Sequence, residues 1–434
     1  MSGYSCRGFI VVCACLFLFP HFSLAVNSCS SVAQVYNSKG VGPANDVPVS
    51  PISEPLLSAC AHSQRLENGS TCCTLAMEET FLLASGNHLR TQIRAINQKL
   101  KDRITMSLNL YKEHLRQTLQ DAQTRTSDKL TTWYKIPREA HKKVLDSFFH
   151  GLRRYLLHES ETRMSDTMKE FFKNLFPLVF EYVIGDPSKT AHLGEEFYGC
   201  LARNYDSIKP FGNIPLYLEK QVTYAFQRAR IFTESLNVMV HTVNVTDHVD
   251  VDSECRRAVT RLEFCSLCSG EAEVKPCRGL CLNVMRGCLA KVTELSSAWI
   301  DVVSGFQNLH LVMVKQHNAE EFVSYMDGNV TDALLHSMDD SLRIYNETLR
   351  LCNKSSNDTN KEKVFKKFTN PAHHTPHTPS AHLQATRNDI STLVQQLEDS
   401  KFFLQQLADG LCRRPSLYDQ EMQSDTCWNG TAVG

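Results

Sequence analysis

Apolar residues recur every three or four positions between residues 89 and 119 of this 434-residue chain. This spacing places them along one face of an α-helix, and polar residues of both charge signs occupy the positions between them. At a rise of 1.5 Å per residue, such a helix is roughly 45 Å long. Further helical periods are predicted near residues 137–160, 165–184, 193–207, 214–240, 291–351 and 388–411. No strand pattern of any length is visible, so the predicted fold class is all-α, with minor β structure at most.

Two stretches of the chain lack helical periods. Residues 26–71 are rich in Ser, Pro and Gly, and residues 353–387 are rich in Asn, Thr, Pro, Lys and His. Segments of the second composition bury too little apolar surface to become ordered, so 353–387 is predicted to be a flexible loop. Its histidines, from His373 to His382, could ligate a metal. A proline-interrupted tract has no fixed geometry, however, and this favours a solvated linker.

The first 25 residues have the pattern of a secretory signal peptide. Arg7 is the only charge, an apolar run extends from Phe9 to Phe19, and small residues surround Ala25. The run is too short to span a bilayer. Cleavage is therefore predicted after Ala25, and the mature chain is expected in the secretory pathway, where disulfides form.

Cysteine is abundant in this chain. Seventeen cysteines occur, and three of them fall within the signal peptide. The fourteen others, an even number in an oxidising compartment, predict seven disulfides. They are Cys29, Cys60, Cys72, Cys73, Cys200, Cys255, Cys265, Cys268, Cys277, Cys281, Cys288, Cys352, Cys412 and Cys427.

The adjacent pair Cys72-Cys73 stands at the start of the long predicted helix. Neighbouring cysteines rarely bond each other because the small ring strains the peptide and the disulfide, so each is expected to have a separate partner. Among the later cysteines, Cys265-x-x-Cys268 with Cys277-x-x-x-Cys281 could form a zinc site, and the first pair alone could be a redox motif. The short spacing between the pairs and the oxidising compartment favour structural disulfides.

Charge and motifs exclude several classes of function. The net charge is −1, from 46 basic and 47 acidic residues, and this does not favour nucleic acid or anionic lipid as a partner. No nucleophile elbow, zinc-protease motif or phosphate-binding loop is present, so no enzyme, metal or cofactor is predicted. Seven Asn-x-Ser/Thr sequons are candidates for N-glycosylation. They are Asn68, Asn244, Asn329, Asn346, Asn353, Asn357 and Asn429.

Several stretches together resemble the glypican family, the core proteins of cell-surface heparan sulfate proteoglycans. They are Cys72-Cys73 followed by TLAMEE, KPFGNIPLYLEKQVTYAFQRARIF at 209–232, FCSLCSG…KPCRGLCLNVMRGCLA at 264–290 and CWNG at 427–430. The number and order of the cysteines also fit, and VNVTDHV at 243–249 is most similar to the glypican three/five branch. The resemblance implies an elongated, helical single core domain over residues 26–434.

The resemblance also implies a disulfide pairing and a cysteine-rich lobe built from residues 29–73 and 255–288. In that pairing, the adjacent cysteines bond to distant partners. The implied pairs are Cys29 with Cys72, Cys60 with Cys265, Cys73 with Cys268, Cys200 with Cys352, Cys255 with Cys288, Cys277 with Cys427, and Cys281 with Cys412.

Glypicans continue past the Cys-Trp-Asn-Gly segment into a stalk that carries heparan sulfate and a signal for a glycosylphosphatidylinositol anchor. Neither the stalk nor the anchor signal is visible before Gly434. The chain is therefore interpreted as a truncated form of an anchored proteoglycan. The alternative is a soluble secreted binding module or decoy. The implied function is to bind and regulate Wnt, Hedgehog, BMP and FGF ligands at the extracellular face of the plasma membrane. The expected partners are these morphogens and growth factors and their receptors.

Overall fold

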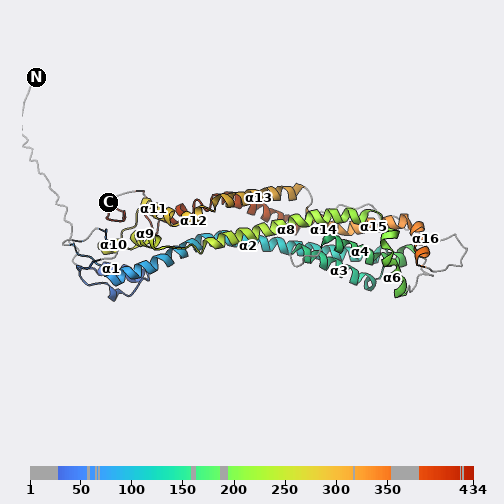
Figure 1. The fold of residues 1–434 in the computed structure, drawn as a ribbon, viewed down its shortest axis with the longest axis horizontal. Helices are drawn as coiled ribbons and strands as arrows, with labels where there is room; N and C mark the ends of the chain where they lie inside the picture. Colours follow the sequence, from blue (N-terminus) through green and yellow to red (C-terminus); the bar gives the residue numbers. More distant parts are fainter. Residues whose placement is uncertain are drawn as a thin grey trace, which may run out of the picture. The chain divides into compact units, whose positions relative to one another are not determined.

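The computed structural model describes residues 28–434, except 56–58, 64–65, 67–68, 158–162, 186–193, 316–317, 353–380, 421 and 423–424 (Figure 1). The side chains of residues 381–386 are not described either. The predicted signal peptide, most of the predicted loop 353–387, and the sequons at Asn68, Asn353 and Asn357 therefore lie outside the described residues.

The described residues fold almost entirely into helices, which confirms the all-α prediction. They form no strand, only isolated bridges such as the one between Ile52 and Thr71. The elements are α1 (Ser30–Ser38), the 3₁₀ turn η1 (Ala44–Asp46), α2 (Leu75–Thr132), α3 (Arg138–Leu156), α4 (Met164–Val179), the π-turn η3 (Phe180–Ile184), α6 (Glu195–Arg203), α7 (Tyr205–Ile208), α8 (Ile214–Thr246), α9 (Ser253–Glu263), α10 (Cys265–Cys268), α11 (Arg278–Cys288), α12 (Ala290–Thr293), α13 (Ser296–Lys315), α14 (Ala319–Ser324), α15 (Met326–Asp339), α16 (Ser341–Leu351), α17 (Ala381–Asp399) and α18 (Leu407–Cys412).

The chain forms two compact units, each assembled from separate stretches of sequence. We call the first the cysteine-rich unit; it contains Met1–Leu89, Val251–Cys288 and Cys412–Gly434. The second, the helical unit, contains Arg90–Asp250 and Leu289–Leu411. Helix α2 contributes its first residues to the cysteine-rich unit and the remainder to the helical unit. The single core domain over residues 26–434 stays a prediction.

The long predicted helix lies within α2, which has 58 residues. Its apolar stripe faces the interior: Ile93, Ile104 and Leu119 are completely buried, whereas Ile96 and Leu100 are half-buried. A regular α-helix turns 100° per residue, so a stripe with this spacing drifts around the helix over several turns. The periodicity therefore predicted which face packs, but not that every position of the stripe is equally covered.

Stacked aromatic side chains contribute to the contacts between helices of the helical unit. Helix α3 packs along α4, where the Phe148 and Phe171 rings stack with their centroids 3.9 Å apart. Helix α8 packs on α13, where the Phe232 and Phe306 rings stack at 4.6 Å. Such ring pairs add about 1 kcal/mol each beyond the area that they bury.

Some predicted boundaries differ from the structure. Helix α17 begins at Ala381, so the end of the predicted loop 353–387 is helical, and the final predicted helix is divided into α17 and α18. The stretch 291–351 is broken between α13 and α14, where the Asn318 side chain caps α14 by accepting a hydrogen bond from the Glu320 N–H. Asn and polar helix-breaking residues compete locally with the helix, which a periodicity of apolar residues does not register.

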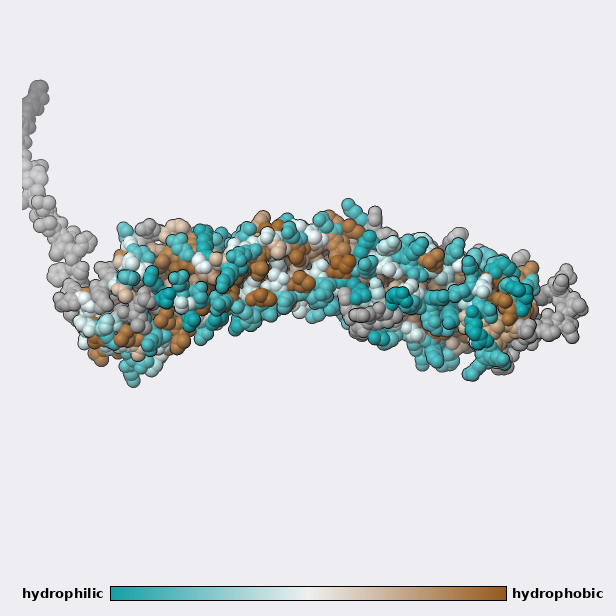
Figure 2. All heavy atoms as spheres, viewed as in Figure 1, coloured by the Kyte–Doolittle hydropathy of each residue, from teal (hydrophilic) through white to brown (hydrophobic). Residues whose placement is uncertain are grey.

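The visible face of the molecule mixes apolar and polar residues (Figure 2). Exposed large apolar side chains occur on α8 at Tyr217, Ile231 and Val238 and on α13 at Leu311 and Val314. Among the described residues, no helix is both long enough and apolar enough to cross a membrane.

Two buried carboxylates in the helical unit show how neighbouring cations set a pKa. Asp327 lies 2.6 Å from the Lys129 ammonium and 3.4 Å from the Arg125 guanidinium. Burial alone would raise the Asp327 pKa, but the two cations outweigh it and hold the pKa below its usual value. Glu320, 3% exposed, lies 3.6 Å from both the Arg387 guanidinium and His114 Nε2, and burial outweighs the opposing effect of Arg387 and raises the Glu320 pKa to about 7.

We predict that Glu320→Gln flattens the pH dependence of stability. The raised pKa means that folded Glu320 holds its proton more tightly than the unfolded chain does, so wild-type stability falls between about pH 4.5 and 7. At pH 7.5 the variant should be about 1–3 kcal/mol more stable than the wild type, and near pH 4.5 the two should be similar. Urea unfolding followed by circular dichroism measures the difference.

The matched control is Glu321→Gln, which removes the exposed neighbouring carboxylate. This control should leave stability within about 0.5 kcal/mol of the wild type at both pH values. A Glu320→Gln variant that is destabilised equally at both pH values would contradict the assignment of a buried carboxylate with a raised pKa.

Candidate functional site

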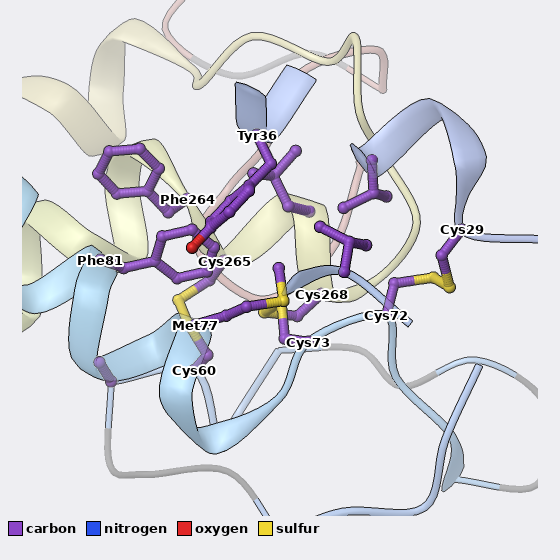
Figure 3. Packing of buried hydrophobic residues seen from close by; sticks show 14 of the residues in the cluster. Cys29, Tyr36, Cys60, Cys72, Cys73, Met77, Phe81, Phe264, Cys265 and Cys268 are labelled. Carbon is purple, nitrogen blue, oxygen red and sulfur yellow. A yellow bond between two sulfur atoms is a disulfide. The ribbon is translucent and has the colours of Figure 1, made fainter. Parts of the chain in front are cut away.

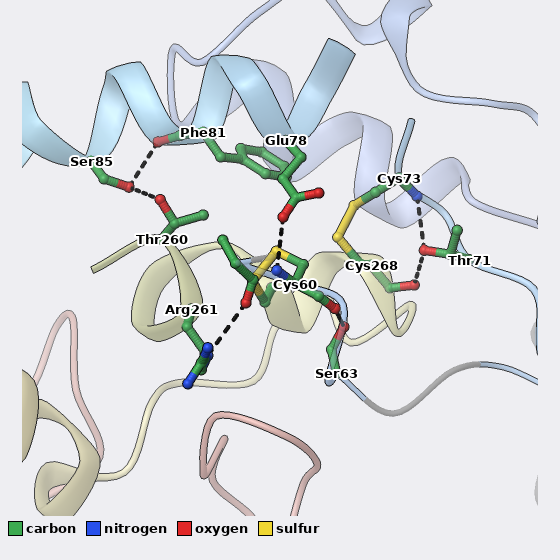
Figure 4. Close-up of a disulfide and its surroundings, with 12 residues drawn as sticks. Cys60, Ser63, Thr71, Cys73, Glu78, Phe81, Ser85, Thr260, Arg261 and Cys268 are labelled. Atoms are coloured by element: carbon green, nitrogen blue, oxygen red, sulfur yellow. Dashed lines mark hydrogen bonds between the residues drawn. A yellow bond between two sulfur atoms is a disulfide. The ribbon is translucent and has the colours of Figure 1, made fainter. Parts of the chain in front are cut away.

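The two adjacent cysteines hold the start of α2 to two different segments (Figure 3), and Figure 4 shows the link between Cys73 and Cys268 from close by. Cys72 pairs with Cys29, and Cys73 pairs with Cys268, with Cα atoms 5.6 and 4.8 Å apart. Thr71 reinforces the second link, because its hydroxyl donates to the Cys268 carbonyl at 2.9 Å and accepts from the Cys73 N–H at 3.2 Å. The first turn of α2 is thereby fixed before its helical hydrogen bonds begin.

The structure places seven cysteine pairs at bonding distance. They are Cys29–Cys72, Cys60–Cys265, Cys73–Cys268, Cys200–Cys352, Cys255–Cys288, Cys277–Cys427 and Cys281–Cys412. These are the same pairs that the resemblance implied. The thiols of the zinc and redox alternatives are used in this pairing, because Cys265 and Cys268 bond to separate partners. In the described part of the chain, no cluster of His, Cys, Asp or Glu could hold a metal ion.

Two of these disulfides run in parallel. Cys60–Cys265 and Cys73–Cys268 span 205 and 195 residues, and either alone would close a loop worth about 5 kcal/mol in the chain-entropy model. Once one has formed, the other closes a loop of only roughly 15 residues, worth about 3 kcal/mol. The second bridge therefore adds less stability than its span suggests, but it prevents the joined segments from rotating about the first.

A compact core surrounds these bridges (Figure 3). The Phe81 ring of α2 stacks on Phe264 with centroids 4.9 Å apart and meets Tyr36 of α1 edge-on at 5.8 Å. Trp428 is fully buried, and its indole N–H donates to the Arg261 carbonyl at 2.8 Å. Segments from the beginning, middle and end of the sequence thus share one core.

Glu263, at the end of α9, connects three segments of the cysteine-rich unit. His88 Nδ1 lies 2.6 Å from one carboxylate oxygen, and the Tyr418 hydroxyl donates to the other at 3.3 Å. The Lys39 ammonium, just after α1, donates to the Glu263 carbonyl at 2.9 Å and lies 5.2 Å from the Phe264 ring centroid. Glu263 itself is 7% exposed.

A cavity of about 450 Å³ adjoins this carboxylate. Ligand pockets in proteins are typically about 300–1,000 Å³. Its lining residues come from the end of α1, from α2, from the α9–α10 corner and from the C-terminal segment: Lys39, Gly40, Val41, Ala84, Asn87, His88, Glu263, Phe264, Pro276, Leu417 and Tyr418. The sequence did not indicate this cavity, because no motif links residues so distant in the chain.

The charged groups at this cavity influence one another. The hydrogen bond to Glu263 raises the His88 pKa above its usual value, and partial burial opposes it. Burial lowers the Lys39 pKa, and the Glu263 charge opposes that change. The cavity is therefore lined by the Lys39 ammonium, by the His88 imidazole with its raised pKa, and by one carboxylate, that of Glu263.

The described sequons differ in exposure. Asn244 and Asn346 are exposed on α8 and α16, whereas Asn329 and Asn429 are partly covered. The Asn429 side-chain oxygen accepts hydrogen bonds from the Thr431 hydroxyl and N–H, both at 2.9 Å, which forms an Asx turn. Occupancy of these four sequons remains a prediction.

The Ser-Gly pairs of the described chain are poorly placed to carry a glycan. Ser85 is fully buried and lies 2.8 Å from the Thr260 hydroxyl, and Ser269 is 7% exposed among the disulfides. Ser304 donates to the Ile300 carbonyl within α13. None of these three serines presents a flexible, exposed hydroxyl.

Comparison with known proteins identifies the family. A family model described as Glypican matches residues 18–434. The chain belongs to the glypican family. Glypican-1 of Xenopus tropicalis is 28% identical over 416 residues, which covers 94% of this chain and 71% of that relative. Human Glypican-5 is 26% identical over 428 residues, which covers 95% of this chain and 70% of that relative. Both are similar to this chain, so its membership of the three/five branch stays a prediction.

Two solved structures share this fold. The crystal structure of the full-length glypican-1 core protein matches with a TM-score of 0.74 at 25% identity, and covers 94% of this chain and 88% of its own. The structure of Dally-like protein in complex with O-palmitoleoyl serine matches with a TM-score of 0.59 at 20% identity, over 94% of this chain and 87% of its own. The second likeness shows the fold alone. Glypicans are proteoglycan core proteins rather than enzymes.

We predict that Cys29→Ser exposes one reactive thiol, that of Cys72, and that Cys29→Ser combined with Cys72→Ser exposes none. Peptide mapping does not assign the partners of Cys72 and Cys73 separately while the peptide bond between them is intact. Replacing both cysteines of one pair is therefore the more direct test of the pairing. Thiol titration of the denatured, unreduced proteins measures the count. Two thiols in the double variant, or stoichiometric zinc in the wild type, would contradict the pairing.

We also predict that His88→Gln destabilises the protein more at low pH than at high pH. The raised pKa means that the His88–Glu263 contact contributes fully below about pH 6.5 and is lost as pH rises through the folded-state pKa. Because the His88 side chain is 42% exposed, the cost at pH 5.5 should be at most about 1 kcal/mol.

Thermal unfolding at pH 5.5 and pH 9 measures this cost, with His62→Gln as the control. His62 is exposed in the same unit, and its substitution should have no comparable effect. A cost that grows with pH would show that neutral His88, and not the imidazolium, makes the stabilising contact.

Proposed function

We propose that this chain is the core of a cell-surface heparan sulfate proteoglycan that binds and regulates secreted morphogens and growth factors of the Wnt, Hedgehog, BMP and FGF classes. The observation that carries the proposal is the glypican family match over residues 18–434, together with the likeness to the glypican-1 core. Attachment to the extracellular face of the plasma membrane through a glycosylphosphatidylinositol anchor is part of the same proposal.

The sulfated chains would concentrate basic ligands by long-range attraction. This attraction is screened by salt, because the Debye length is about 8 Å at physiological ionic strength. We place the attachment of heparan sulfate outside the folded core, since Ser85 and Ser269 are buried and Ser304 is engaged within α13. The folded core would then act as a disulfide-linked support for the glycan.

Direct binding by the core is the second part of the proposal. The fold neighbour Dally-like protein has been solved with O-palmitoleoyl serine, a ligand of that protein. In the present chain, the cavity beside Glu263 is lined by residues of the folded core itself. This supports the alternative of a soluble binding module or decoy that acts without heparan sulfate.

Heparan lyase distinguishes the two forms of the proposal. The full-length protein, extracted from intact cells that express it, should migrate as a high-mass smear that collapses to a sharp band after digestion. Growth-factor binding should fall with digestion and with added salt, since charge on the glycan carries it. A sharp band that the enzyme leaves unchanged, with undiminished ligand binding, would support the glycan-independent module instead.

Two controls complete the experiment. Phosphatidylinositol-specific phospholipase C should release the protein from the cell surface if a lipid anchor holds it. Peptide N-glycosidase should remove only the smaller mass of the N-glycans, so that the two kinds of glycan are not confused.

A further inference from the structure

The cavity beside Glu263 combines a fixed apolar wall with a positively charged end. Val41, Ala84 and Leu417 contribute aliphatic surface from three separate segments. The Phe264 ring is 3% exposed and is held by its stack on Phe81, so it cannot swing into the cavity. The apolar wall is therefore preformed, and a ligand would not have to order it.

At the charged end of the cavity, the Glu263 carboxylate already has hydrogen-bond donors from the protein. Glu263 accepts from His88 and Tyr418 through its side chain and from Lys39 through its carbonyl. An ammonium has three N–H donors, and the bond from Lys39 to this carbonyl uses one of them. Arg414 adds a further positive charge that acts on His88. The balance of charge favours an anion and opposes a cation.

Lys39 is exposed as a whole, so its ammonium is accessible to an anion that enters from solution. Charge-assisted hydrogen bonds, such as that from an ammonium to an anion, are roughly twice as strong as neutral ones.

We propose that the cavity lined by Lys39, His88, Phe264 and Leu417 binds a small organic carboxylate with an apolar body. The carboxylate lies against the Lys39 ammonium, and the apolar body lies along Val41, Ala84 and Leu417. The volume of about 450 Å³ accommodates a molecule the size of an aryl-substituted short-chain acid. Because the site is made by side chains of the folded core, binding does not depend on heparan sulfate.

The test uses 4-phenylbutyrate as the probe and isothermal titration calorimetry of the purified, disulfide-intact secreted protein. Its neutral analogue 4-phenylbutanamide retains the apolar body, and inorganic sulfate retains only a charge. The carboxylate should bind at least about tenfold more tightly than either. Equal binding of the amide, equal binding of sulfate, or no binding of the carboxylate at millimolar concentration would overturn the proposal.

Variants locate the site. Lys39→Gln should weaken binding of 4-phenylbutyrate by about tenfold or more, and Ala84→Leu should block the cavity, because this partly covered position has room for a longer side chain only at the expense of the ligand. Lys291→Gln removes the same charge from an exposed position on α12 and should have no effect. Circular dichroism and thermal unfolding verify that each variant is folded.

Each outcome bears on the proposal. Equal effects of Lys39→Gln and Lys291→Gln would show that net charge alone attracts the probe and would overturn the assigned site. Binding that survives Ala84→Leu would do the same. Digestion with heparan lyase should leave the affinity unchanged, so a proteoglycan that loses growth-factor binding and keeps 4-phenylbutyrate binding would separate this site from the proposed glycan function.

Discussion

Two parallel disulfides, Cys60–Cys265 and Cys73–Cys268, join segments of the chain that are about 200 residues apart. A single bridge would still allow one segment to rotate against the other, whereas two bridges a few residues apart fix the relative orientation of the two segments. The stack of Phe81 on Phe264 and the hydrogen bonds of Thr71 depend on that fixed orientation. The core and cavity of the cysteine-rich unit are built on this double link.

Burial of charge has different outcomes in different places, and the number of nearby cations decides which. Asp327 has two cations within 3.4 Å and stays readily ionised, whereas Glu320 has one guanidinium and one imidazole at 3.6 Å, and burial raises its pKa to about 7. Glu263 is a third case, because its partners come from separate segments and include a tyrosine hydroxyl. A carboxylate satisfied in this way can line a cavity without attracting a cation into it.

Much of the helical architecture could be predicted from the sequence. The spacing of Ile93, Ile104 and Leu119 specified both the helix and its buried face, because a regular helix converts a repeat in sequence into a face in space. The breaks at Asn318 and the early start of α17 at Ala381 could not be predicted in this way. They depend on local capping and on packing rather than on apolar period.

By itself, the sequence determined the helical class, the even set of cysteines and the need for separate partners of Cys72 and Cys73, because each follows from local geometry or composition. Only the tertiary structure decided that Lys39, His88, Glu263 and Tyr418 meet at one cavity. These four residues form no motif in the sequence. They meet because tertiary contacts bring distant segments of the chain together. Disulfides and ring stacking accomplish that closure here, and neither is encoded in any short stretch of sequence.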